Sequence, residues 1–363
     1  MSSSFGQALK LTLFGQSHGP GVGVVIDGFP AGMPIDMEKL AAMQRRRAPG
    51  QSPLTTARRE RDEAEFLSGV LDGVTTGQPL CALIRSTDMH SADYGDGIDL
   101  VRPGHADYTG HVRYFGFEDA RGGGSFSGRL TAPLVTAGAL CLQWLEKQGV
   151  RVYSHISQLG ALRDDPIAQA GPEALAALSA MSLPTLRPGL AEEMEEAILA
   201  AAAAGDSLGG AVTCLIDGLP AGLGAPFFDS VESELSHLLF SVPGVKAVAF
   251  GDGFGFATGR GSEMNDAFRM ENGRVVTATN HSGGVNGGIT NGMPVLFTCA
   301  VRPTPSIAQP QQTVSLRRME NAELAVMGRH DPCILPRFCP VAEAVAAIAV
   351  LDLWKERSAC LRW

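Results

Sequence analysis

Apolar residues recur along the chain at two spacings, one typical of helices and one typical of strands. Helical spacing covers three stretches: Thr131–Gln148, Leu190–Ala204 and Val341–Arg357. Short β-type runs cover four more: Leu80–Ile84, Val245–Phe250, Val275–Thr279 and Val295–Val301. This mixture predicts an α/β protein.

One segment of the pattern occurs twice. Val25–Gly32 returns as Leu215–Gly222, 190 positions later, with six identities in eight. Each copy follows a β-type run, Gly21–Val25 in the first and Gly209–Leu215 in the second. Each copy also precedes a predicted helix, Asp36–Arg46 or Asp229–Phe240. Each of these helices is followed by Pro-Gly, at Pro49-Gly50 or Pro243-Gly244. Parallel flanks favour duplication over chance. We expect one domain over residues 1–363, built from similar halves of about 1–190 and 191–363 around a pseudo-twofold axis.

Long glycine-rich and polar loops separate the predicted elements. They cover Asp88–Asp107, Arg121–Ser127, Gly251–Asp266, Asn280–Gly292 and Arg302–Thr313. Loops of this length in a compact domain are usually functional or disordered, and their few Glu and Lys residues favour function. Arg163–Pro188 is rich in Ala and Pro without evident chemistry, and we expect it to be a peripheral connection.

Composition narrows the class of protein. A net charge of −9 argues against nucleic acid or an anionic membrane as a partner. No apolar run approaches the roughly 18 residues of a membrane span, and no signal peptide is indicated. Seven scattered cysteines without a CxxC pair suit a reducing compartment and argue against a zinc cluster. We therefore expect a cytoplasmic protein without a metal.

Positive charge is concentrated in arginine. Only five of the 29 basic residues are lysine, and six arginines fall within 17 residues: Arg45, Arg46, Arg47, Arg58, Arg59 and Arg61. The planar guanidinium suits bidentate binding of carboxylate and phosphate. A GC-rich genome is an alternative reason for the overall bias, but it does not produce the clustering.

Two loops carry histidine beside glycine. In Phe14–Gly19 the flanking glycines would leave the imidazole of His18 exposed in a cleft, although a lone His is often structural. Arg102–Asp107 supplies an anion contact, a proton donor and a carboxylate within six residues, which suits proton transfer near neutral pH. The alternative for the second loop is a turn with solvated charges.

Three further loops complete the inventory. Arg121–Arg129 places consecutive glycines ahead of a helix, where backbone N–H groups favour a phosphate, but it matches neither a Walker A loop nor a dinucleotide fingerprint. Gly328–Pro332 offers Arg, His and Asp, and reads equally as a salt-bridged loop. Asn280–Gly288 suits either a flat ligand or a tight crossing. Together these loops indicate proton transfers around a bound polyanion.

In this combination the sequence resembles the chorismate synthase family along essentially its whole length. The matching segments, in order, are Gly15–Gly19, Arg45–Arg47, Thr55–Glu60, Arg102–Asp107, Gly205–Ser207, Gly251–Phe254, Asn280–Gly288 and Gly328–Pro332. The resemblance implies a β-α-β sandwich, a homotetramer, and conversion of 5-enolpyruvylshikimate 3-phosphate to chorismate and phosphate. It also implies reduced FMN as cofactor, and NADPH only if the enzyme is bifunctional.

The resemblance also implies roles for individual residues. His18 would protonate or stabilise the reduced flavin, and His105 would assist the departing phosphate. Asp331 would act with the flavin in removing the ring proton, and Ser17 and Ser127 would form a hydroxyl relay. The substrate's anionic groups would be held by Arg46, Arg47, Arg129 and Arg329. The flavin would contact Ser125, Phe126, Ser127, Pro243, Gly244, Gly287, Arg302, Pro303, Thr304, Pro305, Ser306 and Arg329.

Some positions depart from the family pattern. An Arg and a Glu of the glycine-rich loop are absent, because this stretch reads Ser125-Phe126-Ser127-Gly128-Arg129-Leu130. Gln16 replaces a Glu, and Pro305 replaces a hydroxyl residue. These departures support a second hypothesis, a diverged paralogue that binds flavin or anions without turnover. A third hypothesis is a flavin reductase, because the resemblance implies that second activity for some family members.

Overall fold

Two antiparallel sheets form the outer layers of the protein. The computed structural model describes residues 3–50, 54–55, 62–86, 99–326 and 331–359. The first sheet has the order β1-β2-β3-β7-β4, with strands Ser4–Phe5, Lys10–Gly15, Gly21–Asp27, Leu80–Arg85 and Ala64–Ser68. The second has the order β11-β16-β10-β8-β9, with strands Val245–Phe250, Val295–Val301, Gly210–Asp217, Arg151–Leu159 and Leu162–Arg163.

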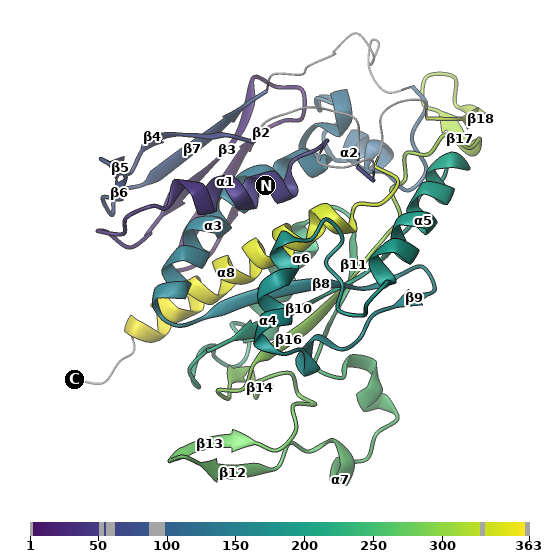
Figure 1. Cartoon of the computed structure of the whole chain (residues 1–363). Helices are drawn as coiled ribbons and strands as arrows, with labels where there is room; N and C mark the ends of the chain where they lie inside the picture. The colour runs from purple at the N-terminus through teal and green to yellow at the C-terminus, as the bar shows by residue number, and fades with distance from the viewer. Residues whose placement is uncertain (1–2, 51–53, 56–61, 87–98, 327–330, 360–363) are drawn as a thin grey trace.

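Helices fill the space between the sheets (Figure 1). They are α1 (Met37–Arg47) and α3 (Thr131–Lys147) beside the first sheet, and α6 (Val231–Ser241) and α8 (Leu335–Ala359) beside the second. Helix α8 is buried around its circumference from Phe338 to Leu353, as expected of a central helix. A Cβ on Gly138 of α3 would lie 2.3 Å from Ala344 of α8, so the two helices touch backbone to backbone.

The smaller elements lie outside this sandwich. Four hairpins pair β5 (Val70–Leu71) with β6 (Val74–Thr75), β12 (Phe268–Glu271) with β13 (Arg274–Thr277), β14 (Val285–Asn286) with β15 (Ile289–Thr290), and β17 (Gln311–Ser315) with β18 (Glu320–Leu324). The remaining helices are α2 (Asp107–Arg113), α4 (Pro172–Ala177), α5 (Leu190–Ala203) and α7 (Gly261–Met264). Within the expected peripheral connection, Leu175 packs against Leu215 on the outer face of the second sheet.

The two sheets are built in the same way. The order β2-β3-β7-β4 in one corresponds to β8-β10-β16-β11 in the other, and each sheet is followed along the chain by its long helix, α3 or α8. The helices that follow the repeated turns are both capped by a side chain, Asp36 for α1 and Ser230 for α6. The strand order divides the chain near Gln148–Val150, earlier than the boundary near residue 190 suggested by the sequence repeat.

A buried threonine fastens each copy of the repeated turn. Thr75 donates to the carbonyl of Pro30 at 2.7 Å and accepts from the amide of Met33 at 3.0 Å. In the second copy Thr290 donates to Pro220 at 2.7 Å and accepts from Leu223 at 2.9 Å. The two copies therefore share a tertiary contact as well as a sequence, which supports duplication.

Several elements differ from expectation, and three of them have a clear physical reason. Helix α8 begins at Leu335 rather than near Val341, because Pro336 occupies the first turn, where its missing N–H costs nothing. Strand β17 begins at Gln311, inside the expected Arg302–Thr313 loop. Strand β8 was not expected, because its buried Ser154 and His155 hide the apolar pattern of a strand.

We predict that Thr75→Val and Thr290→Val each lower the free energy of unfolding by about 1–3 kcal/mol, since each leaves a buried amide or carbonyl without its partner. Urea unfolding measures the loss. Thr76→Val on the exposed side of the same hairpin is the matched control and should change stability by less than about 0.5 kcal/mol. A loss at only one of the two buried threonines would contradict their equivalence.

Candidate functional site

The candidate site lies between two connections, one in each half of the chain, that join the last strand of a sheet to the long helix after it. Residues 86–130 join β7 to α3, and residues 302–334 join β16 to α8. The two connections pair through an isolated bridge between Leu100 and Ser315, and Ser315 also donates from its hydroxyl to Asp99 at 2.5 Å. Arg302 donates to the carbonyl of Gly104 and ties the connections a second time. Both long helices therefore begin beside the same space.

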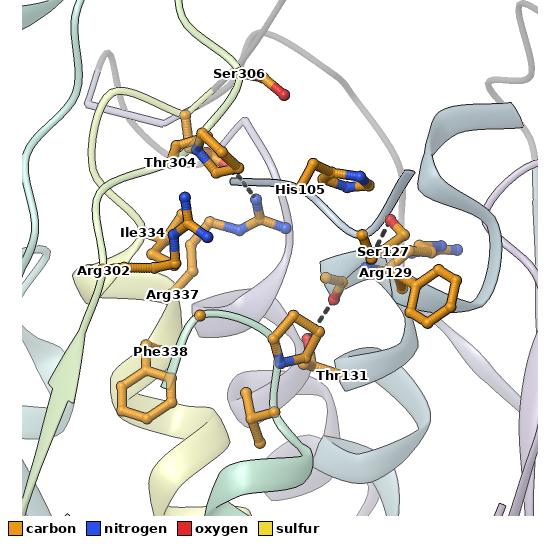
Figure 2. Close-up of a pocket in the computed structure, with 18 of the residues that line it drawn as sticks. His105, Ser127, Arg129, Thr131, Arg302, Thr304, Ser306, Ile334, Arg337 and Phe338 are labelled. Carbon is orange, nitrogen blue, oxygen red and sulfur yellow. Dashed lines mark hydrogen bonds and ion pairs between the residues drawn. The ribbon is translucent and has the colours of Figure 1, made fainter. Parts of the chain in front are cut away.

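That space is a cavity of about 520 Å³, within the range of small-molecule sites. Figure 2 shows Thr304, Arg302 and Arg337 on one side of it, facing His105, Ser127 and Arg129 on the other. Apolar side chains such as Val242, Ile334 and Phe338 line part of the wall. The ends of α1 and α6 also reach the cavity, through Pro49 and Pro243, which are matching positions of the two copies.

A buried carboxylate organises one wall of the cavity. Asp62, 4% exposed, forms ion pairs with both Arg47 and Arg129, which come from α1 and from the turn before α3. Burial lowers the pKa of Arg47 to about 10; Asp62 opposes this shift, and the nearby charges of Arg337 and Arg129 add to it. One acid thus holds two cations side by side at this wall.

His105 is oriented by the carboxylate of its own loop. Its Nδ1 lies 2.7 Å from Oδ1 of Asp107, and the guanidinium of Arg102 donates to both carboxylate oxygens at 2.7 Å. Burial alone would raise the pKa of Asp107, but the hydrogen bonds and charges of Arg102 and His105 hold it well below its usual range. Because an ionised carboxylate accepts only, Nδ1 carries the proton and Nε2 remains for a ligand.

Consecutive glycines of the Arg121–Arg129 loop pack against two imidazoles. A Cβ on Gly122 would come 2.1 Å from the ring of His18, and one on Gly123 would come 3.2 Å from Nε2 of His105. Both glycines have positive φ, 60° and 87°. The expectation that His18 is exposed in a cleft is wrong, because the loop covers it and leaves it 7% exposed.

The opposite wall carries an acid and hydroxyl groups. Asp331 accepts from Nη1 of Arg337 at 2.6 Å, and both residues line the cavity. The hydroxyl of Thr304 is buried in the wall without a hydrogen-bond partner among the described residues. Ser306, 7% exposed, lies two residues further along. A ligand with acceptor atoms would satisfy the Thr304 hydroxyl.

Most residues assigned by resemblance line this one cavity. They are Arg47, His105, Ser125, Phe126, Ser127, Arg129, Pro243, Gly244, Arg302, Pro303, Thr304, Pro305, Ser306 and Asp331. Ser17 and His18 lie behind the glycine loop, where the amide of Ser17 donates to Gly124 at 3.2 Å. Arg329 lies outside the described residues.

Two assigned residues lie elsewhere and have structural partners. Arg46 forms hydrogen bonds of 2.6 and 2.8 Å to Glu343 of α8; burial opposes its charge, but Glu343 raises the pKa of Arg46 above its usual value. Gly287 and Gly288 form the turn between β14 and β15, with φ of 61° and 83°, as a two-residue hairpin favours. Neither Arg46 nor Gly287 lines the cavity.

Sequence reasoning did not single out three charged residues of the site, Asp62, Lys246 and Arg337. A signal existed for Arg337, because a cation in the first turn of a helix opposes the helix dipole and calls for a nearby anion. No comparable signal pointed to Asp62, because a single acidic residue within a charged stretch of sequence is common and does not indicate burial. Lys246 was noted only as one of the few lysines.

We predict that Asp62→Asn lowers the free energy of unfolding by about 3–5 kcal/mol, because two buried guanidiniums lose their counter-charge. Denaturant unfolding measures the change. Glu65→Gln, which removes an exposed ion pair to Arg85 at 3.0 Å, is the matched control and should cost less than about 1 kcal/mol. Equal effects of the two substitutions would contradict the organising role of Asp62.

Known proteins match this chain over nearly its full length. The family profile described as "Chorismate synthase" matches residues 9–354. The chain is 44% identical to the chorismate synthase of Methanosarcina barkeri, covering 96% of this chain and 94% of that protein, and 45% identical to that of Thermococcus gammatolerans, covering 98% of each. A solved structure described as "Crystal Structure of Chorismate Synthase" superposes with a TM-score of 0.75 at 26% identity, covering 97% of this chain and 93% of that one. The chain belongs to the chorismate synthase family.

Proposed function

We propose that the cavity is the active site of a lyase that eliminates phosphate from 5-enolpyruvylshikimate 3-phosphate to give chorismate, with reduced FMN bound beside the substrate. The observation that carries the proposal is the convergence of His105, Asp331 and several cations on one cavity of suitable size. The reaction needs three functions: anchoring of a polyanion, assistance to the departing phosphate, and removal of a ring proton.

His105 is the residue we assign to the departing phosphate. Its ring lines the cavity, and Asp107 fixes the proton on Nδ1, so the protonated ring donates from Nε2. A phosphate that leaves as a dianion gains negative charge as the C–O bond breaks, and a hydrogen bond that strengthens with that charge lowers the barrier. Arg102 stabilises the carboxylate that orients the ring, so it acts through Asp107.

Asp331 is the carboxylate we assign to the ring proton. It is the acid that lines the cavity among the described residues, and the hydrogen bond from Arg337 fixes its orientation. Arg47 and Arg129 are the cations we assign to the substrate's carboxylates, because both line the cavity and their ion pairs with Asp62 fix their positions there. A rigid guanidinium pair suits planar carboxylates.

The residues present fit a flavin nucleotide. The cavity combines an apolar wall from Val242, Ile334 and Phe338 with the unsatisfied hydroxyl of Thr304, so a flat ring and a polar tail both find partners. Phe126 lines the cavity as well, and its ring occupies the space over Gly110, where a Cβ would come within 2.6 Å. When bound, reduced flavin would lend electron density to the breaking C–O bond.

His18 remains proposed to protonate or stabilise the flavin, with Ser17 and Ser127 as a hydroxyl relay. Arg46, Gly287 and Arg329 remain proposed contacts from the resemblance alone. We also propose a homotetramer located in the cytoplasm. Exposed aromatic residues such as Phe227 and Phe228, 88% and 86% exposed, support an assembly. Among the described residues no helix is long and apolar enough to span a membrane.

We predict that the chain releases chorismate and phosphate from 5-enolpyruvylshikimate 3-phosphate when given chemically reduced FMN without oxygen. His105→Ala should lower kcat by about 10²–10⁴-fold and still bind oxidised FMN, because it removes only the proton donor. Absorbance of chorismate and a phosphate assay follow the reaction.

His111→Gln is the control, since His111 pairs with Glu118 at 3.2 Å and does not line the cavity. Absence of product from the wild-type chain would refute the lyase. Wild-type turnover in His105→Ala would refute the role of His105.

We predict that Asp107→Asn also lowers kcat by about 10²–10⁴-fold, because an amide can hold the ring in the wrong tautomer. The lowered pKa of Asp107 means that its stabilisation is present above its unfolded value of about 3.9 and is lost only as pH falls through the native pKa. The wild type should therefore lose stability relative to the variant as the pH falls below about 4. Equal acid sensitivity of the two proteins in that range would contradict a native Asp107 that is ionised.

A further inference from the structure

Lys246 is a cation of the cavity wall that has no acidic partner among the described residues. Arg47 and Arg129 share Asp62, Arg102 pairs with Asp107, and Arg337 pairs with Asp331, as described above. Arg302 donates to the carbonyls of Gly104 and Pro303. Lys246 has no hydrogen bond or ion pair in the described part of the chain, yet it lines the cavity. Its charge is therefore available to a ligand.

The local backbone explains why this lysine reaches the cavity. Strand β11 pairs with β16 through Val245–Val301 and then Ala247–Ala300, so two steps on β11 oppose one step on β16. Lys246 is the extra residue of this β-bulge. Bulges interrupt the regular alternation of side chains and often re-aim one beside a functional site. We attribute the position of Lys246 at the cavity to this bulge, because the alternation of a regular strand does not account for it.

The neighbours of Lys246 belong to one wall of the site. The amide of Arg302 donates to the carbonyl of Gly244 at 2.9 Å, which joins the start of β11 to the Arg302–Ser306 segment. That segment carries the buried, unsatisfied hydroxyl of Thr304. Lys246, Arg302 and Thr304 therefore all line the cavity from this part of the chain, and an ammonium, a guanidinium and a hydroxyl together suit a phosphate monoester.

The proposed reaction brings two phosphate groups into the cavity. One belongs to the substrate and must leave, and we have assigned it to His105 on the opposite connection. The other belongs to the flavin nucleotide and stays through every turnover. A cation without an internal counter-charge suits the permanent group, since nothing in the protein competes for it.

We propose that Lys246 binds the phosphate of the flavin nucleotide, together with Thr304. This inference rests on the proposed function. It assigns Lys246 to cofactor affinity, and it makes the bulge of β11 part of the binding site.

The test compares two flavins that differ only in the phosphate. Binding of oxidised FMN and of riboflavin is measured by quenching of flavin fluorescence for the wild type, Lys246→Gln and Lys246→Arg. We expect Lys246→Gln to raise the Kd for FMN about tenfold and to leave that for riboflavin unchanged, because it removes one charge-assisted hydrogen bond. Lys246→Arg should retain most of the affinity, and the effect of Lys246→Gln should shrink as salt is added.

Lys147→Gln is the matched control, because Lys147 lies at the opposite end of α3 from the cavity, about 24 Å along the helix axis. An unchanged Kd for FMN in Lys246→Gln overturns the inference, including the case in which the KM for the substrate rises instead. Equal weakening of FMN and riboflavin also overturns it. A wild-type chain that does not bind FMN would refute the flavin part of the proposed function itself, whereas binding that Lys246→Gln does not alter refutes only the role of Lys246.

Discussion

The contact between α3 and α8 is the constraint on which the site depends. Gly138 lets the backbone of α3 meet Ala344 of α8, and no larger residue fits at 138 without separating the helices. Each helix begins at the cavity and continues one of the two connections that line it. The width of the cavity is therefore set inside the core, away from any ligand. Close packing resists gradual change, so the two walls keep one spacing.

Charge in the cavity is arranged in two ways. Arg102, Arg337 and the pair Arg47–Arg129 are each held by an acid, which fixes their geometry and removes part of their charge. Arg302 and Lys246 have no acid beside them in the described chain. A wall with fixed, partly neutralised cations positions a ligand, and a wall with uncompensated cations adds affinity for anions. Both are useful to an enzyme whose ligands carry several negative charges.

The sequence predicted the long helices and the repeated turn, because periodicity and turn motifs are local signals, whereas many residues of the cavity's lining were named only through the resemblance to a known family. It did not predict β8, in which the buried Ser154 donates to Glu343, a partner far along the chain. Asp62 was missed for the same reason, since its two arginines lie on other elements. The placement of Arg46 against Glu343 and of His18 under the loop also depends on tertiary contacts. Local patterns name such residues but do not show which way they face.

The three consecutive glycines have a consequence for how this chain can vary. Side chains at Gly122 and Gly123 would press on the two imidazoles, and one at Gly124 would come 1.9 Å from the carbonyl of Asp119. A planar peptide of fixed length joins Gly122 to Gly123, and these glycines lie against His18 and His105 respectively. The peptide therefore sets the position of one imidazole relative to the other. Replacing any of these three glycines by a residue with a side chain would therefore produce a steric clash. Within this glycine-rich loop, the departures from the pattern that the resemblance implies begin at Ser125, the first residue after the triplet.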